Sequence, residues 1–219
     1  MKALLFDTET TGATNPEIIE AAWVELDTPS TLNIINTHNQ RYKPSKRIEL
    51  GALATHHIYD EELEFCPPSS SFKLPTNVGY IIGHNVDYDW NVAGCPDTKR
   101  ICTLALSRKF YPEADSHSQS ALVYLLDRAN ARERLKNAHS ALADVQNCLL
   151  ILKNIIKAHG NISTWEDLWL LSEQSRLPTH MPFGKHKGLP ISSVPADYKA
   201  WLLRQDNVDP YLIAALKSA

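Results

Sequence analysis

The chain has 219 residues, of which 43% are hydrophobic, and its 22 Lys and Arg against 25 Asp and Glu give a formal net charge of −3. This length allows one main domain with a sizeable core and a small second module. The charge excludes a general polyanion binder, so any affinity for nucleic acid must be local or metal-mediated. The sequence has no signal peptide, no run of about 20 apolar residues and no C-x-x-C pair, and we therefore expect a cytoplasmic protein with reduced thiols and no membrane contact.

The first part of the chain predicts β-structure. The short apolar run Ala3–Phe6 is typical of a strand that is buried on both faces. Ile18–Leu26 and Leu32–Tyr42 are rich in β-branched and aromatic residues, and the turn residues 27–30 lie between them. We therefore expect three successive antiparallel strands.

The middle of the chain predicts a loop, a strand and then a long helix. Residues 66–77 hold three prolines and three serines, which indicates a loop, and Tyr80–Gly83 follows as a buried strand. A helix should then end at Gly160. Its apolar stripe has spacings of three and four residues and comprises Leu142, Val145, Leu149, Leu152 and Ile156.

Four acids and one histidine stand out as candidates for chemistry. Asp7 and Glu9 lie two residues apart on a predicted strand and share a face. Carboxylates about 4 Å apart repel by about 4 kcal/mol at an effective dielectric of about 20, so the pair requires a cation. Asp89, His139 and Asp144 follow far along the chain. Four oxygen ligands and one proton acceptor are what a two-metal phosphodiesterase needs.

The segments that carry these residues also show a family resemblance. In order along the chain, Phe6–Gly12, His84–Asp89 and His139–Asp144 resemble the three motifs of the DnaQ-like 3′–5′ exonuclease family with an active-site histidine, the DEDDh branch. The resemblance spans roughly residues 1–160. It implies an α/β fold of the ribonuclease-H-like type, in which helices flank a mixed five-stranded sheet.

The resemblance also implies the metal ligands and the general base. Two Mg²⁺ ions, for which Mn²⁺ can substitute, are expected on Asp7, Glu9, Asp89 and Asp144. His139, at the start of the long helix, is the expected general base. The sister branch uses a tyrosine four residues before the last acid, and here that residue is Ser140.

The third acid has an alternative. The family places this acid directly after an aromatic residue, which favours Asp89 after Tyr88, and Asp87 remains the fallback. His84, in the same segment, is expected to be structural rather than catalytic.

Substrate contacts are expected by the same resemblance from Thr8, Thr10, His56 and Asn85. His56 belongs to a segment that resembles the family's His-Gly-Ile element, in which His57 stands in place of the glycine. The contact at that position is therefore an open question.

The implied activity is hydrolysis of a nucleic acid from its 3′ end to 5′-mononucleotides. A narrower likeness within the family, carried by Ile101–Leu104 and Met181–Gly188, favours DNA, either single-stranded or at the 3′ ends of a duplex. The motifs do not indicate whether the 2′-hydroxyl of the substrate is recognised, so RNA is the alternative substrate. From a different class, the chain could be an inactive nucleic-acid-binding module, and a homodimer is left open.

The sequence predicts a separate tail. We expect the exonuclease domain at 1–160, a helical connector at 161–177 and a small α+β accessory module at 178–219. The module should contain a tight basic turn at Gly184–Gly188 between two extended pieces, followed by two short helices.

The basic turn has two interpretations. Lys185 and Lys187 either solubilise an exposed hairpin or bind substrate phosphates. The aromatic residues behind the turn, Tyr198 and Trp201, are expected in the core.

Overall fold

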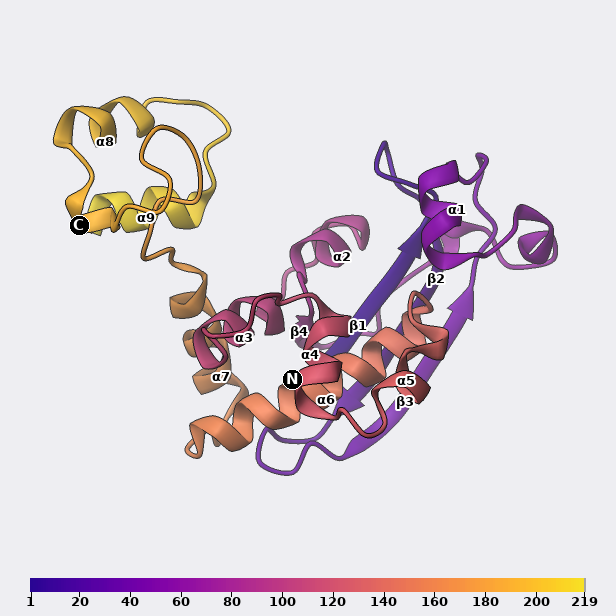
Figure 1. Cartoon of the computed structure of the whole chain (residues 1–219). Coiled ribbons are helices and arrows are strands. Elements are labelled where there is room, and N and C mark those ends of the chain that lie inside the picture. The colour runs from indigo at the N-terminus through magenta and orange to yellow at the C-terminus, as the bar shows by residue number, and fades with distance from the viewer. Residues whose placement is uncertain (219) are drawn as a thin grey trace. The chain divides into compact units, whose positions relative to one another are not determined.

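The computed structural model describes residues 1–218, and its first unit is built on a five-stranded mixed sheet of order β3-β2-β1-β4-β5 (Figure 1). β1 pairs antiparallel with β2 and parallel with β4, so the first strand of the chain lies at the centre. The predicted fold class is confirmed. The strands are β1 (Lys2–Thr10), β2 (Ile18–Leu26), β3 (Ile34–Arg41), β4 (Val78–Gly83) and β5 (Lys99–Cys102).

The predicted antiparallel run of three strands is correct. β2 pairs with both β1 and β3, and β1 extends beyond the predicted Ala3–Phe6 because every residue from Ala3 to Thr10 has a partner on β2. The short strand β5 was not predicted. It pairs parallel with β4 and has only four residues, too few for a clear alternating pattern.

The long helix α6 (Ala141–His159) packs across β1 and β2, as the apolar stripe predicts. Gly160 ends it in the left-handed region, with φ 81° and its N–H donating to Ile156. Leu5 of β1 belongs to the core on this face of the sheet, whereas Leu4 and Phe6 belong to the core on the other face. Odd-numbered residues of β1 therefore point toward α6.

Shorter helices make up the rest of the first unit, and the last of them, α7 (Trp165–Arg176), extends beyond the end of this unit at Ser172. The predicted loop at 66–77 contains one 3-10 turn, Ser69–Ser71, and its Phe72 stacks on Phe6 with ring centroids 6.1 Å apart. The helices are α1 (Leu50–His56), α2 (Asp87–Val92), α3 (Thr103–Phe110), α4 (Gln119–Leu126), α5 (Ala131–Arg134) and α7 (Trp165–Arg176).

The chain divides into two compact units, Met1–Ser172 and the residues from Glu173 onward, with the boundary inside α7. The second unit contains α8 (Ala196–Leu202) and α9 (Pro210–Ser218) and has its own apolar core, centred on Met181 and Leu212. Within residues 1–218, no helix is both long and apolar enough to cross a membrane.

The second unit holds the predicted turn between extended pieces, since His180 and Pro190 form an antiparallel bridge. Tyr198 packs partly against the core. The expectation that Trp201 is a core residue was wrong, because its side chain is 46% exposed.

Candidate active site

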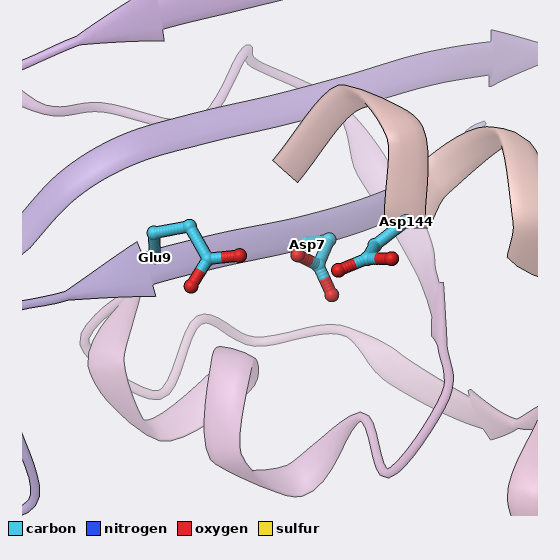
Figure 2. A group of neighbouring side chains, drawn as sticks. All are labelled: Asp7, Glu9 and Asp144. Atoms are coloured by element: carbon cyan, nitrogen blue, oxygen red, sulfur yellow. The ribbon is translucent and has the colours of Figure 1, made fainter. Parts of the chain in front are cut away.

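Three carboxylates meet where β1 passes the first turn of α6. Asp7 and Glu9 occupy odd positions of β1 and so face the helix, on which Asp144 lies in the first turn (Figure 2). One oxygen from each of the three side chains lies within 4.8 Å of the other two. These acids, which are 137 residues apart at most in sequence, therefore form one cluster.

The surroundings of the three carboxylates disfavour the state in which all three are ionised. Burial, followed by repulsion from Asp144 and Glu20, raises the pKa of Glu9 to about 9. Burial raises the pKa of Asp7 well above its ordinary range, with Asp89 and Asp144 adding to the effect. Burial also raises the pKa of Asp144. A divalent cation would allow all three to ionise, and an all-oxygen donor set fits Mg²⁺ or Mn²⁺ better than zinc.

Asp89 approaches the cluster from α2 but is held by β1. Its Oδ1 accepts hydrogen bonds from the backbone N–H and hydroxyl of Thr8, at 2.9 and 2.7 Å. Burial raises its pKa to about 7, although both hydrogen bonds act in the opposite direction. Asp87 instead forms a 2.6 Å ion pair with Arg100. Of the two candidate acids, Asp89 is therefore the one buried beside Asp7.

His139 stands at the start of α6 with its side chain exposed. Its backbone has φ 66°, and its N–H donates to Oδ2 of Asp144 at 3.1 Å. This turn ties the histidine to the last acid of the cluster. The residue also lines a cavity of about 520 Å³ that reaches His56 and His57. An imidazole in this position is open to solvent and has room to accept a proton from water.

A fifth acid, Glu20, was missed by the sequence analysis. It lies opposite Glu9 on β2, is buried, and accepts hydrogen bonds from the Ala141 N–H at 2.8 Å and from Arg41 Nε at 3.1 Å. Glu20 thus binds the first turn of α6 to the sheet. The sequence does contain a signal for Glu20, because this acid lies inside the apolar stretch Ile18–Leu26. A carboxylate that is buried in such a strand needs a hydrogen-bond or charge partner.

A second cavity, of about 350 Å³, opens beside Glu9 and contains three of the predicted substrate residues. Thr8, Thr10 and His56 line it, together with Tyr88. The hydroxyls of Thr10 and Tyr88 are 2.6 Å apart. The cavity is therefore lined in part by polar groups, and Glu9 of the carboxylate cluster is one of its lining residues.

The His56–Ile58 element forms the end of α1. His56 is buried, and its Nδ1 accepts the Ile58 N–H at 3.0 Å. His57 caps the helix with φ 59°, and its N–H donates to Leu53. This left-handed conformation explains why glycine suits the position, and His57 adopts it at some cost in strain.

The remaining predicted residues are not among those that line these two cavities. Both ring nitrogens of His84 have partners, Thr103 Oγ1 at 3.1 Å and the His117 carbonyl at 2.9 Å, and burial lowers its pKa to about 4. His84 therefore links the end of β4 to Thr103 of α3 and to the segment before α4, in line with the structural role expected for it. Asn85 follows it, exposed and with φ 69°. Lys185 and Lys187 are exposed in the second unit.

A ribonuclease-H-like sheet with clustered acids on its central strand and at the start of the covering helix defines a metal-dependent nuclease of the DnaQ-like class. In agreement, the sequence model of the Exonuclease family (RNase T) matches residues 4–152, and the chain belongs to this family. Exonucleases of the family depend on divalent metal ions, and the three carboxylates are close enough together to hold one.

Individual relatives agree with the family. The chain is 28% identical over 220 residues to exodeoxyribonuclease 10 of Escherichia coli K12, covering 97% of this chain and 96% of that one. Its fold is similar to exonuclease X in complex with 5′ overhanging duplex DNA, with a TM-score of 0.59, 24% identity, and coverage of 76% of this chain and 99% of that one. It is also similar to the nuclease domain of 3′hExo, a DEDDh family member bound to rAMP, with a TM-score of 0.55, 18% identity, and coverage of 71% and 92%.

The narrower likeness carried by Ile101–Leu104 and Met181–Gly188 was to bacterial exodeoxyribonuclease X, and the relatives support it. The second unit also matches a family of its own. Residues 174–212 match a family described as a putative quorum-sensing-regulated virulence factor.

Proposed function

We propose that the chain is a Mg²⁺-dependent 3′–5′ exodeoxyribonuclease that releases 5′-mononucleotides, with Mn²⁺ as a competent substitute. The observation that carries the proposal is the convergence of Asp7, Glu9 and Asp144 within 4.8 Å, with Asp89 beside them and His139 at the helix start. The names of the relatives, exodeoxyribonuclease 10 and an exonuclease X bound to DNA, favour DNA as the substrate.

In the proposed mechanism, Asp7, Glu9, Asp89 and Asp144 would hold the divalent metal. Bound Mg²⁺ would polarise the scissile phosphate, acidify the attacking water and stabilise the leaving 3′-oxygen. His139, when neutral, accepts the proton from that water. Its exposed position allows it to pass the proton to solvent after each turnover.

The chain's other residues position the substrate. The cavity beside Glu9 would receive the 3′-terminal nucleotide, with Thr10 and His56 as its polar wall. Thr8 contributes indirectly, because its hydroxyl and N–H hold Asp89. We also propose Asn85 as a contact to the strand, from its exposed place between β4 and α2.

One assay tests the proposal. Single-stranded DNA and RNA of matched sequence, labelled at the 3′ end in one set and at the 5′ end in another, are incubated with the purified protein in Mg²⁺ and then in excess chelator. We expect immediate release of the 3′ label as a mononucleotide and stepwise shortening of the 5′-labelled strand. Both should occur only with metal and be faster on DNA.

Other outcomes would change the conclusion. Equal or faster cleavage of RNA would identify a ribonuclease with the same chemistry. No cleavage of either strand in Mg²⁺ or Mn²⁺ would refute the nuclease function and leave the inactive binding module as the alternative, and cleavage in chelator would refute the metal site.

A further inference from the structure

A basic and aromatic surface lies on the second unit, remote in sequence from the carboxylate cluster. The loop Gly184–Gly188 carries Lys185 and Lys187, both exposed and neither in an ion pair within residues 1–218. From Glu173 onward the chain has six Lys and Arg against four Asp and Glu, although the whole chain has a net charge of −3. The positive charge of the protein is therefore relatively concentrated in this unit, where it can attract a polyanion.

The backbone of the loop adds donors to these charges. Gly184 and Gly188 have φ values of 76° and 82°, and the loop is closed by the Lys187 N–H donating to Gly184 at 3.1 Å. In the described part of the chain, the successive N–H groups of Lys185 and His186 have no protein acceptor. Successive free N–H groups in a turn form a concavity that suits an anion such as a phosphate.

The loop is held in place by α8. A Cβ at Gly184 would lie 2.7 Å from the hydroxyl of Tyr198, so the glycine allows the Tyr198 side chain to pack onto the loop backbone. The rings of His186 and Tyr198 meet edge to face, with centroids 4.6 Å apart. A loop fixed in this way loses little freedom when a ligand binds.

The ring contacts continue from His186 and Tyr198 to the solvent-exposed Trp201. The Trp201 ring lies 5.3 Å from the Tyr198 ring and is 46% exposed, and Phe183, just before the loop, is 45% exposed. Trp201 lies outside the apolar core of the unit, so packing does not explain its presence. Exposed aromatic rings beside lysines are a stacking platform for unpaired bases, whose faces are accessible in a single strand and covered in a duplex.

We propose that the loop surface, defined as Lys185, His186, Lys187, Tyr198 and Trp201, binds single-stranded DNA without sequence preference. The lysines and the free N–H groups bind phosphates, and Trp201 stacks on a base. The nature of this ligand rests on the proposed nuclease function. A strand bound by the second unit is kept at a high effective concentration near the first unit, so long strands are hydrolysed more efficiently than short ones.

The test measures binding apart from catalysis. Binding of a 5′-fluorescein-labelled dT20 by the full chain is followed by anisotropy in excess EDTA across a range of salt concentrations. For Lys185→Ala with Lys187→Ala, we expect weaker binding and a log–log salt slope reduced by up to about 1.4, which corresponds to two phosphate contacts on a single strand. Trp201→Ala should weaken binding about 5- to 150-fold, the usual effect of losing one stacked base.

Matched variants separate these effects from misfolding and from loss of charge. Lys153→Ala with Lys157→Ala removes two exposed charges from α6 and should leave affinity and slope near the parent values. Trp201→Phe retains an aromatic face and should recover most of the affinity lost in Trp201→Ala. The melting temperature of each variant reports whether it is folded.

The activity assay distinguishes failure of this proposal from failure of the proposed function. At low enzyme concentration, the double lysine variant should have a lower kcat/KM on dT20 than the parent. On a saturating trinucleotide it should have the same kcat as the parent. A parent chain that binds dT20 through the loop but hydrolyses nothing would refute only the nuclease function. An active parent with the same affinity and salt slope as the double lysine variant would refute the loop surface as a DNA-binding site. Failure of the parent to bind dT20 would also refute it.

Discussion

At the scale of single residues, Asp7 has an unusual environment, because it is a half-buried acid whose pKa is raised by burial and by the neighbouring acids. Asp7→Asn should abolish metal-dependent hydrolysis. The same change should raise the melting temperature in chelator, because it removes one repelling carboxyl, and should remove the rise that Mg²⁺ produces in the parent.

Asp87→Asn is the matched control for this prediction. It alters an acid of the neighbouring segment that is paired with Arg100 on the surface, and it should leave both activity and the metal response intact. Loss of activity in Asp87→Asn with retention in Asp89→Asn would reverse the assignment of the third ligand.

His139 allows a second prediction, because its side chain is outside the carboxylate cluster. His139→Ala should lower kcat about 10²- to 10⁴-fold, the usual contribution of a general base, and leave the Mg²⁺-induced rise in melting temperature unchanged. A near-parental rate at neutral pH would assign proton transfer to another group.

At the scale of elements, the start of α6 is the junction on which the site depends, and Glu20 holds it to the sheet. Glu20→Ala leaves Arg41 and the Ala141 N–H without their buried acceptor and should cost about 1–3 kcal/mol of unfolding free energy, together with a lower kcat. Glu20→Gln retains an acceptor of the same size and should recover most of the stability.

Glu25→Ala, on the same strand, is the comparison for Glu20. Glu25 pairs with the half-exposed Lys2, and a surface ion pair contributes only about 0–1 kcal/mol. An equal loss of stability in the two alanine variants, measured by urea unfolding, would show that Glu20 has no special role at the helix start.

The elements also show what a single sequence can and cannot predict. The strand Ala3–Phe6 and the helix before Gly160 were predicted because a buried strand and an apolar stripe leave clear periodic patterns. The four residues of β5 were too few for such a pattern. Glu20 was missed because its role depends on the pairing of β2 with β1 and on the packing of α6 across both strands. Both contacts join segments that are not neighbours in the local sequence pattern. Trp201 has the helical spacing from Tyr198 that is typical of a core residue. Its exposure depends on how the second unit packs, which the local sequence does not show.

At the scale of the whole molecule, the acid cluster makes stability depend on pH in an unusual direction. The pKa of Glu9 is raised from an ordinary 4.5 to about 9, so between these values the folded chain binds more protons than the unfolded chain. By linkage, the unfolding free energy contributed by Glu9 is fully present below about pH 4.5 and is lost as the pH rises toward 9.

The measurement is the melting temperature in chelator from pH 5 to pH 9, for the parent and for Glu9→Gln. We expect the parent to lose more stability than the variant as the pH rises, and saturating Mg²⁺ to reduce the difference. A parent curve that runs parallel to that of Glu9→Gln would show that Glu9 ionises as easily as it does in the unfolded chain.

The central position of β1 has a consequence for biosynthesis. During synthesis β1 can pair with β2 early, because the two strands are close in sequence, but its other neighbour, β4, is complete only at Gly83, and Asp144 is added later still. Contacts so distant in sequence form slowly. A nascent chain that ends before Asp144 therefore lacks part of the proposed ligand set, so hydrolysis by the proposed mechanism can begin only after α6 has been synthesised and has packed on the sheet.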